Sequence, residues 1–237
     1  MGRRLMRQFA LKMADLWRLE GGDPVDNWLV TWSGWELFQT AQARGRGVLL
    51  ITPHLGNWEL GGPLLAKRGV SLIVITQAEP DSTLTELRKV SRARWGIQTV
   101  VVGQDAFAFI EVIRRLQEGA TVAMLIDRPP APGAVGVQLF GQPFQASIAA
   151  AEMARASGCA LLGVYVPRME KGYAAHILPE FAYDRQRLGS REARQQLTQE
   201  IMSAFEGVIR QHLDQWYHFV PIWGQPGVAR TPAKPQV

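Results

Sequence analysis

The residues best suited to chemistry lie in one short segment, from His54 to Glu59, with the sequence HLGNWE. The apolar run Gly47 to Leu50 before it predicts a buried strand, and residues 60–67 after it predict the start of a helix. Histidine titrates near neutral pH, so an imidazole at this turn can take a proton from a hydroxyl and return it to a leaving group. A carboxylate bonded to its other ring nitrogen would fix the tautomer that such a base needs.

The spacing of His54 and Glu59 restricts how the two side chains can meet. Five positions along a regular helix turn by about 500°, so the two would not share a helix face. They can meet only if His54 lies in the turn and Glu59 in the first turn of the helix. Gly56 and Asn57 permit such a bend, because both tolerate unusual backbone angles. The alternative interpretation is a buried histidine in the turn and an ordinary acidic residue at the start of a helix.

The segment from His54 to Glu59 resembles the signature of the bacterial lipid A late acyltransferases, the lauroyl/myristoyl transferase family, within the wider His-x4-Asp/Glu glycerolipid acyltransferases. Three later segments carry the resemblance further: Arg92 to Gly96, Leu139 to Phe144, and the aromatic segment 215–223. The resemblance implies that His54 is the general base and that Glu59 is its charge partner.

Four further residues are predicted to bind substrate. The resemblance implies a required role for Arg92, with Arg94 as a neighbouring competitor, and an arginine fork suits a phosphate group. Asp127 is predicted to orient Arg92 or the substrate, although a turn-capping aspartate is the alternative. The backbone N–H groups near Asn57 are predicted to stabilise an oxyanion at the helix start.

The pattern from residue 47 onward predicts an α/β fold. Apolar strands alternate with helices, which indicates a mostly parallel central sheet with helices on both faces, like that of the glycerolipid acyltransferases. Binding sites in such sheets lie beyond the carboxyl ends of the strands. His54 and Asp127 both follow predicted strands, so we expect them to line one cleft. The predicted strands are 48–53, 70–76, 97–102, 121–126, 159–167 and 173–178, and the predicted helices are 26–43, 57–67, 81–94, 105–118, 146–157 and 191–213.

We expect three parts along the chain. Residues 1–22 form a basic amphipathic helix, residues 23–223 a single acyltransferase domain, and residues 224–237 a disordered tail rich in Pro and Gly. The first helix suits either the surface of a membrane or docking on the core. The Pro- and Gly-rich segment 129–136 is a candidate gate over the cleft or a rigid connector.

Composition excludes several classes of function. Lys and Arg exceed Asp and Glu, 26 against 21, which favours acidic partners, but no nucleic-acid motif accompanies the charge. The single Cys159 excludes an intramolecular disulfide, and four scattered histidines lack the spacing of metal ligands. No redox-cofactor motif follows a strand. Without a signal peptide or an apolar run of about 20 residues, we expect a cytoplasmic chain that rests on a membrane without crossing it. The resemblance implies that this membrane is the inner membrane, with the protein peripheral at its cytoplasmic face.

The predicted function is acyl transfer. The resemblance implies that a fatty acyl chain moves from acyl carrier protein or acyl-CoA to a hydroxyl of a glycolipid of lipid A precursor type, with no further cofactor. One alternative is transfer to another glycolipid, such as a phosphatidylinositol mannoside. A second is hydrolysis of an acyl ester or thioester by the same base, and a third is a non-catalytic peripheral membrane-binding protein.

Overall fold

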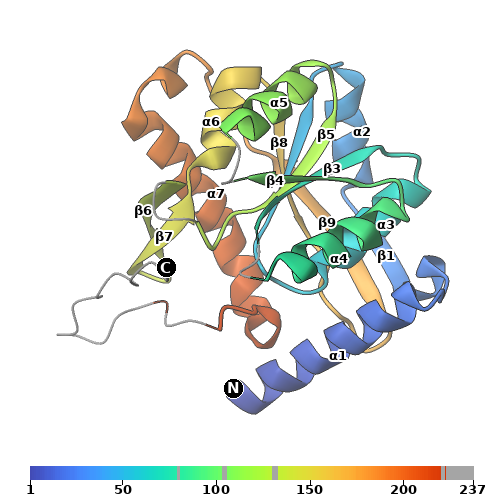
Figure 1. Ribbon diagram of the computed structural model, residues 1–237. Helices are drawn as coiled ribbons and strands as arrows, with labels where there is room; N and C mark the ends of the chain where they lie inside the picture. The colour runs from blue at the N-terminus through green and yellow to red at the C-terminus, as the bar shows by residue number, and fades with distance from the viewer. Residues whose placement is uncertain (79–80, 103–105, 130–132, 220–221, 223–237) are drawn as a thin grey trace.

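The computed structural model of the protein describes residues 1–78, 81–102, 106–129, 133–219 and 222. It confirms the predicted α/β fold: a seven-stranded, mostly parallel sheet carries helices on both faces (Figure 1). The strands of this sheet are β1 (Leu29–Ser33), β2 (Val48–Thr52), β3 (Leu72–Gln77), β4 (Gln98–Val102), β5 (Thr121–Leu125), β8 (Ala160–Tyr165) and β9 (Tyr173–Glu180). The α-helices are α1 (Gly2–Glu20), α2 (Trp35–Ala43), α3 (Trp58–Lys67), α4 (Ser82–Ala93), α5 (Ala106–Gln117), α6 (Ala149–Ser157) and α7 (Arg191–Gln211).

The strand order determines which loops meet at the carboxyl edge of the sheet. The order is β1-β9-β8-β2-β5-β3-β4, and β9 runs antiparallel to β8 while the five strands from β8 to β4 run parallel. β2 and β5 are therefore neighbours although β3 and β4 separate them in the sequence. Thr52 is in register with Leu125, so the loops that follow these two strands begin side by side.

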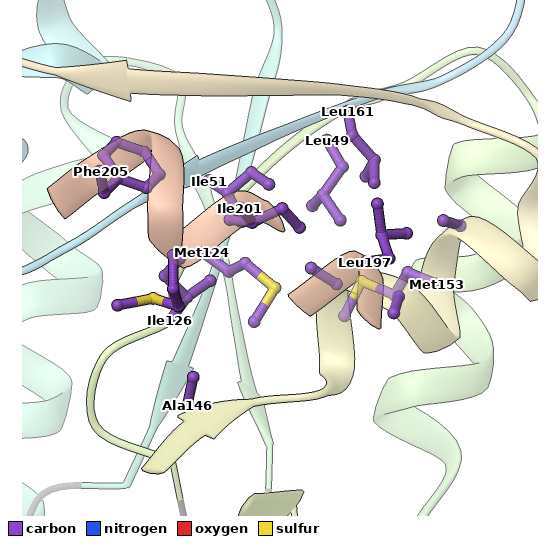
Figure 2. Packing of buried hydrophobic residues seen from close by; sticks show 14 of the residues in the cluster. Leu49, Ile51, Met124, Ile126, Ala146, Met153, Leu161, Leu197, Ile201 and Phe205 are labelled. Carbon is purple, nitrogen blue, oxygen red and sulfur yellow. The ribbon is translucent and has the colours of Figure 1, made fainter. Parts of the chain in front are cut away.

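The larger core lies on the face of the sheet covered by α5, α6 and α7. Figure 2 shows side chains of β2 and β5 directed toward those of α6 and α7. Full burial of each such side chain is worth about 1.5–3 kcal/mol, so this face fixes the strands that carry the loops at the carboxyl edge. The residues labelled there include Leu49, Ile51, Met124, Ile126, Met153, Leu197, Ile201 and Phe205.

Two regions differ from the sequence prediction. The predicted helix 26–43 is wrong in its first half, where a 3-10 turn (Val25–Trp28) and edge strand β1 precede α2. Gly34 separates the strand from the helix with a positive φ of 75°, a conformation that glycine adopts without strain. The aromatic and β-branched residues Thr31 and Trp32 suit the strand, which pairs with β9.

The second difference is a hairpin between β5 and α6. Strands β6 (Ala134–Leu139) and β7 (Gln142–Ser147) pair antiparallel, so the candidate gate 129–136 lies partly in a strand. Val135, Val137 and Leu139 are buried while the residues between them face outward, the period-two pattern of a half-buried strand. Residues 130–132 of the candidate gate, and the predicted tail 224–237, lie outside the described residues.

Helix α1 packs against the rest of the fold. Its buried residues are Lys12, Asp15 and Leu19, and Asp15 accepts hydrogen bonds from Tyr173 and Arg168. Figure 1 shows α1 beginning beside the segment that follows α7 and running below α4, and the helix contacts the short 3-10 turn η4 (Leu213–Gln215). In the described part of the chain, no helix is both long and apolar enough to cross a membrane.

Candidate active site

His54 and Asp127 form the central contact at the carboxyl edge of the sheet. The Nδ1 of His54 lies 2.6 Å from Oδ1 of Asp127, and the backbone N–H of His54 donates to Oδ2 of the same carboxylate at 2.9 Å. Because a carboxylate can only accept, Nδ1 is the protonated nitrogen and Nε2 carries the free lone pair. The adjacency of β2 and β5 brings His54 and Asp127 together. The prediction that both line one cleft is correct for His54 and wrong for Asp127, which is buried behind the imidazole and does not line the cavity.

The Asp127 carboxylate is fully buried, and it accepts a third hydrogen bond besides the two from His54. Trp216, which follows η4, donates its indole N–H to Oδ2 at 2.8 Å. Burial alone would raise the pKa of Asp127, but the His54 charge and the hydrogen bonds from His54 and Trp216 outweigh it and lower the pKa to about 2. The aspartate is therefore ionised at neutral pH and can stabilise a protonated His54 imidazole.

The expected contact between His54 and Glu59 is wrong. Glu59 is the second residue of α3, and its carboxylate accepts two hydrogen bonds from Arg92, at 2.7 Å and 3.1 Å. Burial opposes its ionisation, but the Arg92 charge and hydrogen bonds dominate and lower the pKa of Glu59. Arg92 therefore contacts Glu59, and Asp127 contacts His54. Asp127 was predicted to orient Arg92 or the substrate, and its contact with Arg92 is not found.

The predicted oxyanion donors also differ from expectation. The N–H of Gly56 donates to the carbonyl of Gln215 at 3.0 Å, and that of Asn57 to the carbonyl of Val166 at 2.8 Å. Both groups are thus occupied by the fold. Gly56 has a φ of 64°, and a Cβ there would lie 2.1 Å from the Val166 carbonyl oxygen, so this close approach requires glycine.

Besides Asp127, two of the predicted substrate-binding residues do not line the cavity. Asn57 is buried as the N-cap residue of α3, and it does not line the cavity beside His54. Arg94 is largely exposed at the end of α4, where it pairs with Glu20 of α1 at 3.3 Å. Arg92 does line the cavity, together with Glu59 and His54.

A cavity of about 290 Å³ opens beside His54 and extends under α3. Leu72, Val74 and Thr76 of β3 all line it. Alternate residues of a strand face one side, and four residues span about 13 Å along it, so the cavity runs back from the carboxyl edge into the fold. Toward the start of β3 the lining includes Leu72, Leu65 and Ile97, whereas His54 follows β2 at the carboxyl edge. This shape suits a long apolar chain with a polar end beside the imidazole.

Gly61 and Gly62 of α3 line the same cavity. A Cβ on Gly62 would lie 2.6 Å from Cδ1 of Ile97, and one on Gly61 would lie 3.8 Å from Val166. A methyl group at position 62 would therefore clash with Ile97. A methyl group at position 61 would make only an ordinary van der Waals contact with Val166.

The sequence analysis missed the residues that reach the site from the two ends of the chain. Trp216 and Tyr217 follow α7, and the backbone N–H of Tyr217 donates to the carbonyl of His54 at 2.8 Å. Their aromatic segment was noted for its resemblance, yet its contact with Asp127 depends on tertiary folding. Lys12 and Phe9 come from α1 and also line the cavity, and helical periodicity alone gave no signal for them.

Comparison with known proteins decides the family. The model of the family described as bacterial lipid A biosynthesis acyltransferase matches residues 4–225. The chain belongs to this family. The resemblance carried by residues 54–59 is thereby confirmed, and the family's acyltransferase class agrees with the predicted chemistry.

The chain is also similar to individual acyltransferases from mycobacteria. A phosphatidylinositol mannoside acyltransferase of Mycobacterium tuberculosis (strain H37Rv) is 24% identical over 192 residues, which cover 80% of the chain and 58% of that protein. The corresponding enzyme of Mycolicibacterium smegmatis is 24% identical over 181 residues, covering 76% of the chain and 57% of that protein. The chain thus spans less than two thirds of the length of these relatives.

Proposed function

We propose that the protein transfers a fatty acyl chain from a thioester to a hydroxyl group of a glycolipid, with His54 as the general base and Asp127 as its orienting partner. The observation that carries this proposal is the bond between His54 Nδ1 and Asp127 at the polar end of a deep apolar cavity. The bond leaves Nε2 of His54 as the free base, and the cavity beside it suits an acyl chain.

The chemistry needs no protein nucleophile. His54 Nε2 takes the proton of the acceptor hydroxyl while its oxygen attacks the thioester carbonyl, and Asp127 stabilises the imidazolium that forms. The tetrahedral intermediate then expels the thiolate, which takes the proton from His54 and leaves as a thiol. Cys159 has no part in this, because burial raises the pKa of its thiol to about 11.

The start of α3 is the proposed source of oxyanion stabilisation. Trp58 and Glu59 open this helix, and the first N–H groups of a helix have no acceptor within it. The helix dipole adds a partial positive charge at the same end. These two amides would replace those of Gly56 and Asn57, which the fold already uses. Glu59 and Arg92 would act as positioning residues, because their ion pair joins α3 to α4 along the wall of the cavity.

A lipid A precursor and a phosphatidylinositol mannoside are the two acceptor classes to compare. The family description names the first, and the names of the mycobacterial relatives contain the second. The thioester donor would be either acyl carrier protein or acyl-CoA, with either acceptor. We also propose that the protein works at a membrane surface, where both acceptors reside, with α1 and α4 facing the lipid.

Lipid mass spectrometry on the purified chain tests the proposal. Acyl carrier protein and CoA thioesters of several chain lengths are supplied with each acceptor in detergent, beside the His54→Ala variant. We expect one acyl chain to be added to one acceptor class by the parent chain and none by the variant. Free fatty acid without acylated lipid would instead support hydrolysis, and no donor consumption by folded protein would support the non-catalytic alternative.

A further inference from the structure

Lys12 of α1 is a buried cation that the proposed chemistry does not use. Only 3% of the residue is exposed, and its Nζ lies 3.2 Å from the centroid of the Trp58 ring. The Trp58 ring in turn packs edge-on against His54, with 5.0 Å between ring centroids. Lys12 therefore lies within the catalytic cavity, one aromatic ring away from the imidazole.

The ammonium of Lys12 makes no close contact with a carboxylate among the described residues, although the Glu59 charge acts on it from a distance. Across the described residues, we find neither a hydrogen bond nor an ion pair from its Nζ, whose near neighbours are the aromatic rings of Trp58, Phe9 and Tyr217. A buried charge without a hydrogen-bonding partner is costly, and an apolar side chain of the same length would pack at lower cost. A cation in this position is therefore better explained by a ligand than by the stability of the fold.

The charges of two other cationic side chains act on Lys12 within the same cavity. Arg88 of α4 and Arg128, which follows Asp127, line the same cavity. The carboxylate that acts on Lys12 is Glu59, which is already engaged by Arg92. Burial, reinforced by the Arg88 and Arg128 charges and opposed by Glu59, lowers the pKa of Lys12 to about 7. An entering anion would favour the protonated amine, so the cluster is suited to receive one.

We propose that Lys12, together with Arg88 and Arg128, binds a phosphate group of a substrate at the mouth of the catalytic cavity. The inference rests on the proposed function for its substrates, and it assigns to α1 a share of the substrate site. Both proposed substrates carry phosphate: the phosphopantetheine arm of the donor and the headgroup of the acceptor lipid. Arginine and lysine donors converging on one point recognise phosphate through charge-assisted hydrogen bonds.

Calorimetric binding in the His54→Ala background tests the inference without any turnover, so it stands or falls separately from acyl transfer. Coenzyme A and pantetheine are compared for the donor, and dihexanoyl phosphatidylinositol and dihexanoylglycerol for the acceptor. The variants are Lys12→Met, which removes the charge, Lys12→Arg, which keeps it, and Arg7→Met. Arg7 is an exposed cation of the same helix, so its variant controls for net charge.

We expect one phosphate-bearing probe to bind, and Lys12→Met to weaken it by about ten- to a hundred-fold, the loss of one charge-assisted hydrogen bond. Lys12→Arg should stay within a few-fold of the parent, and Arg7→Met should not differ from it. The phosphate-free probes should be insensitive to Lys12. Whichever probe responds identifies the donor or the acceptor as the source of the phosphate.

Three results would overturn the inference. One is equal affinity of the parent and Lys12→Met for both phosphate probes, and another is no binding of either probe to the parent. The third is an equal loss for probes with and without phosphate, which would indicate a structural role. Thermal unfolding separates this last case, because Lys12→Met should unfold at a temperature no lower than the parent if the lysine serves a ligand.

Discussion

The two carboxylates near His54, those of Asp127 and Glu59, bind different partners. Asp127 holds the imidazole, while Glu59 holds Arg92 and joins α3 to α4. Both side chains of the Glu59–Arg92 pair are mostly buried, so removing one charge would leave the other uncompensated. We expect Glu59→Gln to lower the free energy of unfolding by about 3 kcal/mol.

Thermal unfolding measures this loss. A chain of this length should lose about 5–10 °C in Tm for such a change. The double variant Glu59→Leu/Arg92→Met removes both charges, and it should be more stable than Glu59→Gln. A Glu59→Gln chain as stable as the parent would show that the pair does not support the fold.

Lys12 gives a stability difference that depends on pH. Its pKa is lowered from 10.5 to about 7 in the folded protein, so between these values the unfolded chain binds more protons. Stability from this group therefore rises as pH increases from about 7 toward 10.5, because deprotonating the amine on folding costs less as the pH approaches its unfolded pKa. The charges of Glu59 in α3, of Arg88 in α4 and of Arg128 after β5 all act on Lys12. The Tyr217 ring lies beside its ammonium.

Comparison with Lys12→Met isolates this term, because other groups titrate alike in both chains. We expect the variant to be more stable than the parent near pH 6, with a difference that shrinks as pH rises toward 10. Urea unfolding at several pH values measures the difference. A difference independent of pH would contradict the lowered pKa of Lys12.

The position of a single residue was predictable from the sequence only where it depends on the strand or helix next to it in the chain. His54 and Asp127 each follow a strand, so the sequence could place both at the carboxyl edge. Which carboxylate reaches the imidazole depends on strand order, because β5 lies beside β2 despite the two intervening strands. Spacing alone favoured Glu59, which is near in sequence but turned toward Arg92 by the first turn of α3.

At the scale of elements, helix α3 and its glycines determine the width of the cavity. A methyl group on Gly62 would lie 2.6 Å from Cδ1 of Ile97, which also lines the cavity, whereas Gly61 has space for one. We expect Gly62→Ala to shift the preferred acyl chain to a shorter length, and Gly61→Ala to leave it unchanged. Competition among thioester donors of mixed length, read by mass spectrometry, measures the preference.

A second substitution gives the complement of this test. Ile97→Val shortens the side chain that faces Gly62, so Gly62→Ala/Ile97→Val should recover much of the original preference. An unchanged preference in Gly62→Ala, with Ile97 repacked away from the cavity, would show that another part of the wall limits chain length.

Elements were predictable where one period dominates the sequence. The alternation from β2 to β5 was found with bounds close to those observed, and Asp81 caps α4 as expected by accepting from the N–H of Thr83. Residues 26–33 were mistaken for helix because their apolar residues fit both periods, and only pairing with β9 decides for a strand over residues 29–33. The hairpin β6–β7 was missed because its Pro- and Gly-rich approach masked a short alternating pattern.

At the scale of the whole molecule, exposed apolar side chains gather on the helices beside the cavity. Leu84, Leu87 and Val90 project from α4 among basic residues, and Met6 and Trp17 project from neighbouring α1. An apolar stripe with basic neighbours suits the surface of an anionic membrane. This placement would bring the mouth of the cavity to the lipid that it acts on.

Vesicle binding tests this orientation. We expect Leu87→Glu to weaken binding to anionic vesicles by about ten-fold, the order expected for losing one buried leucine. Ile110→Glu is a matched control, because Ile110 is 60% exposed against 61% for Leu87 but lies on α5 at the opposite face of the sheet. Equal loss in both variants, or none in Leu87→Glu, would contradict the assignment of α4 to the membrane.

The most direct test of the central claim is the rate of acyl transfer in a double-mutant cycle of His54→Ala and Asp127→Asn. If the two residues act as one unit, each single variant should lose about 10²–10⁴-fold in kcat, and the double variant should be no slower than His54→Ala. Thermal unfolding would confirm that all four chains are folded. A rate of Asp127→Asn within about threefold of the parent, or losses that multiply in the double variant, would contradict the assignment of Asp127 as the partner of the base.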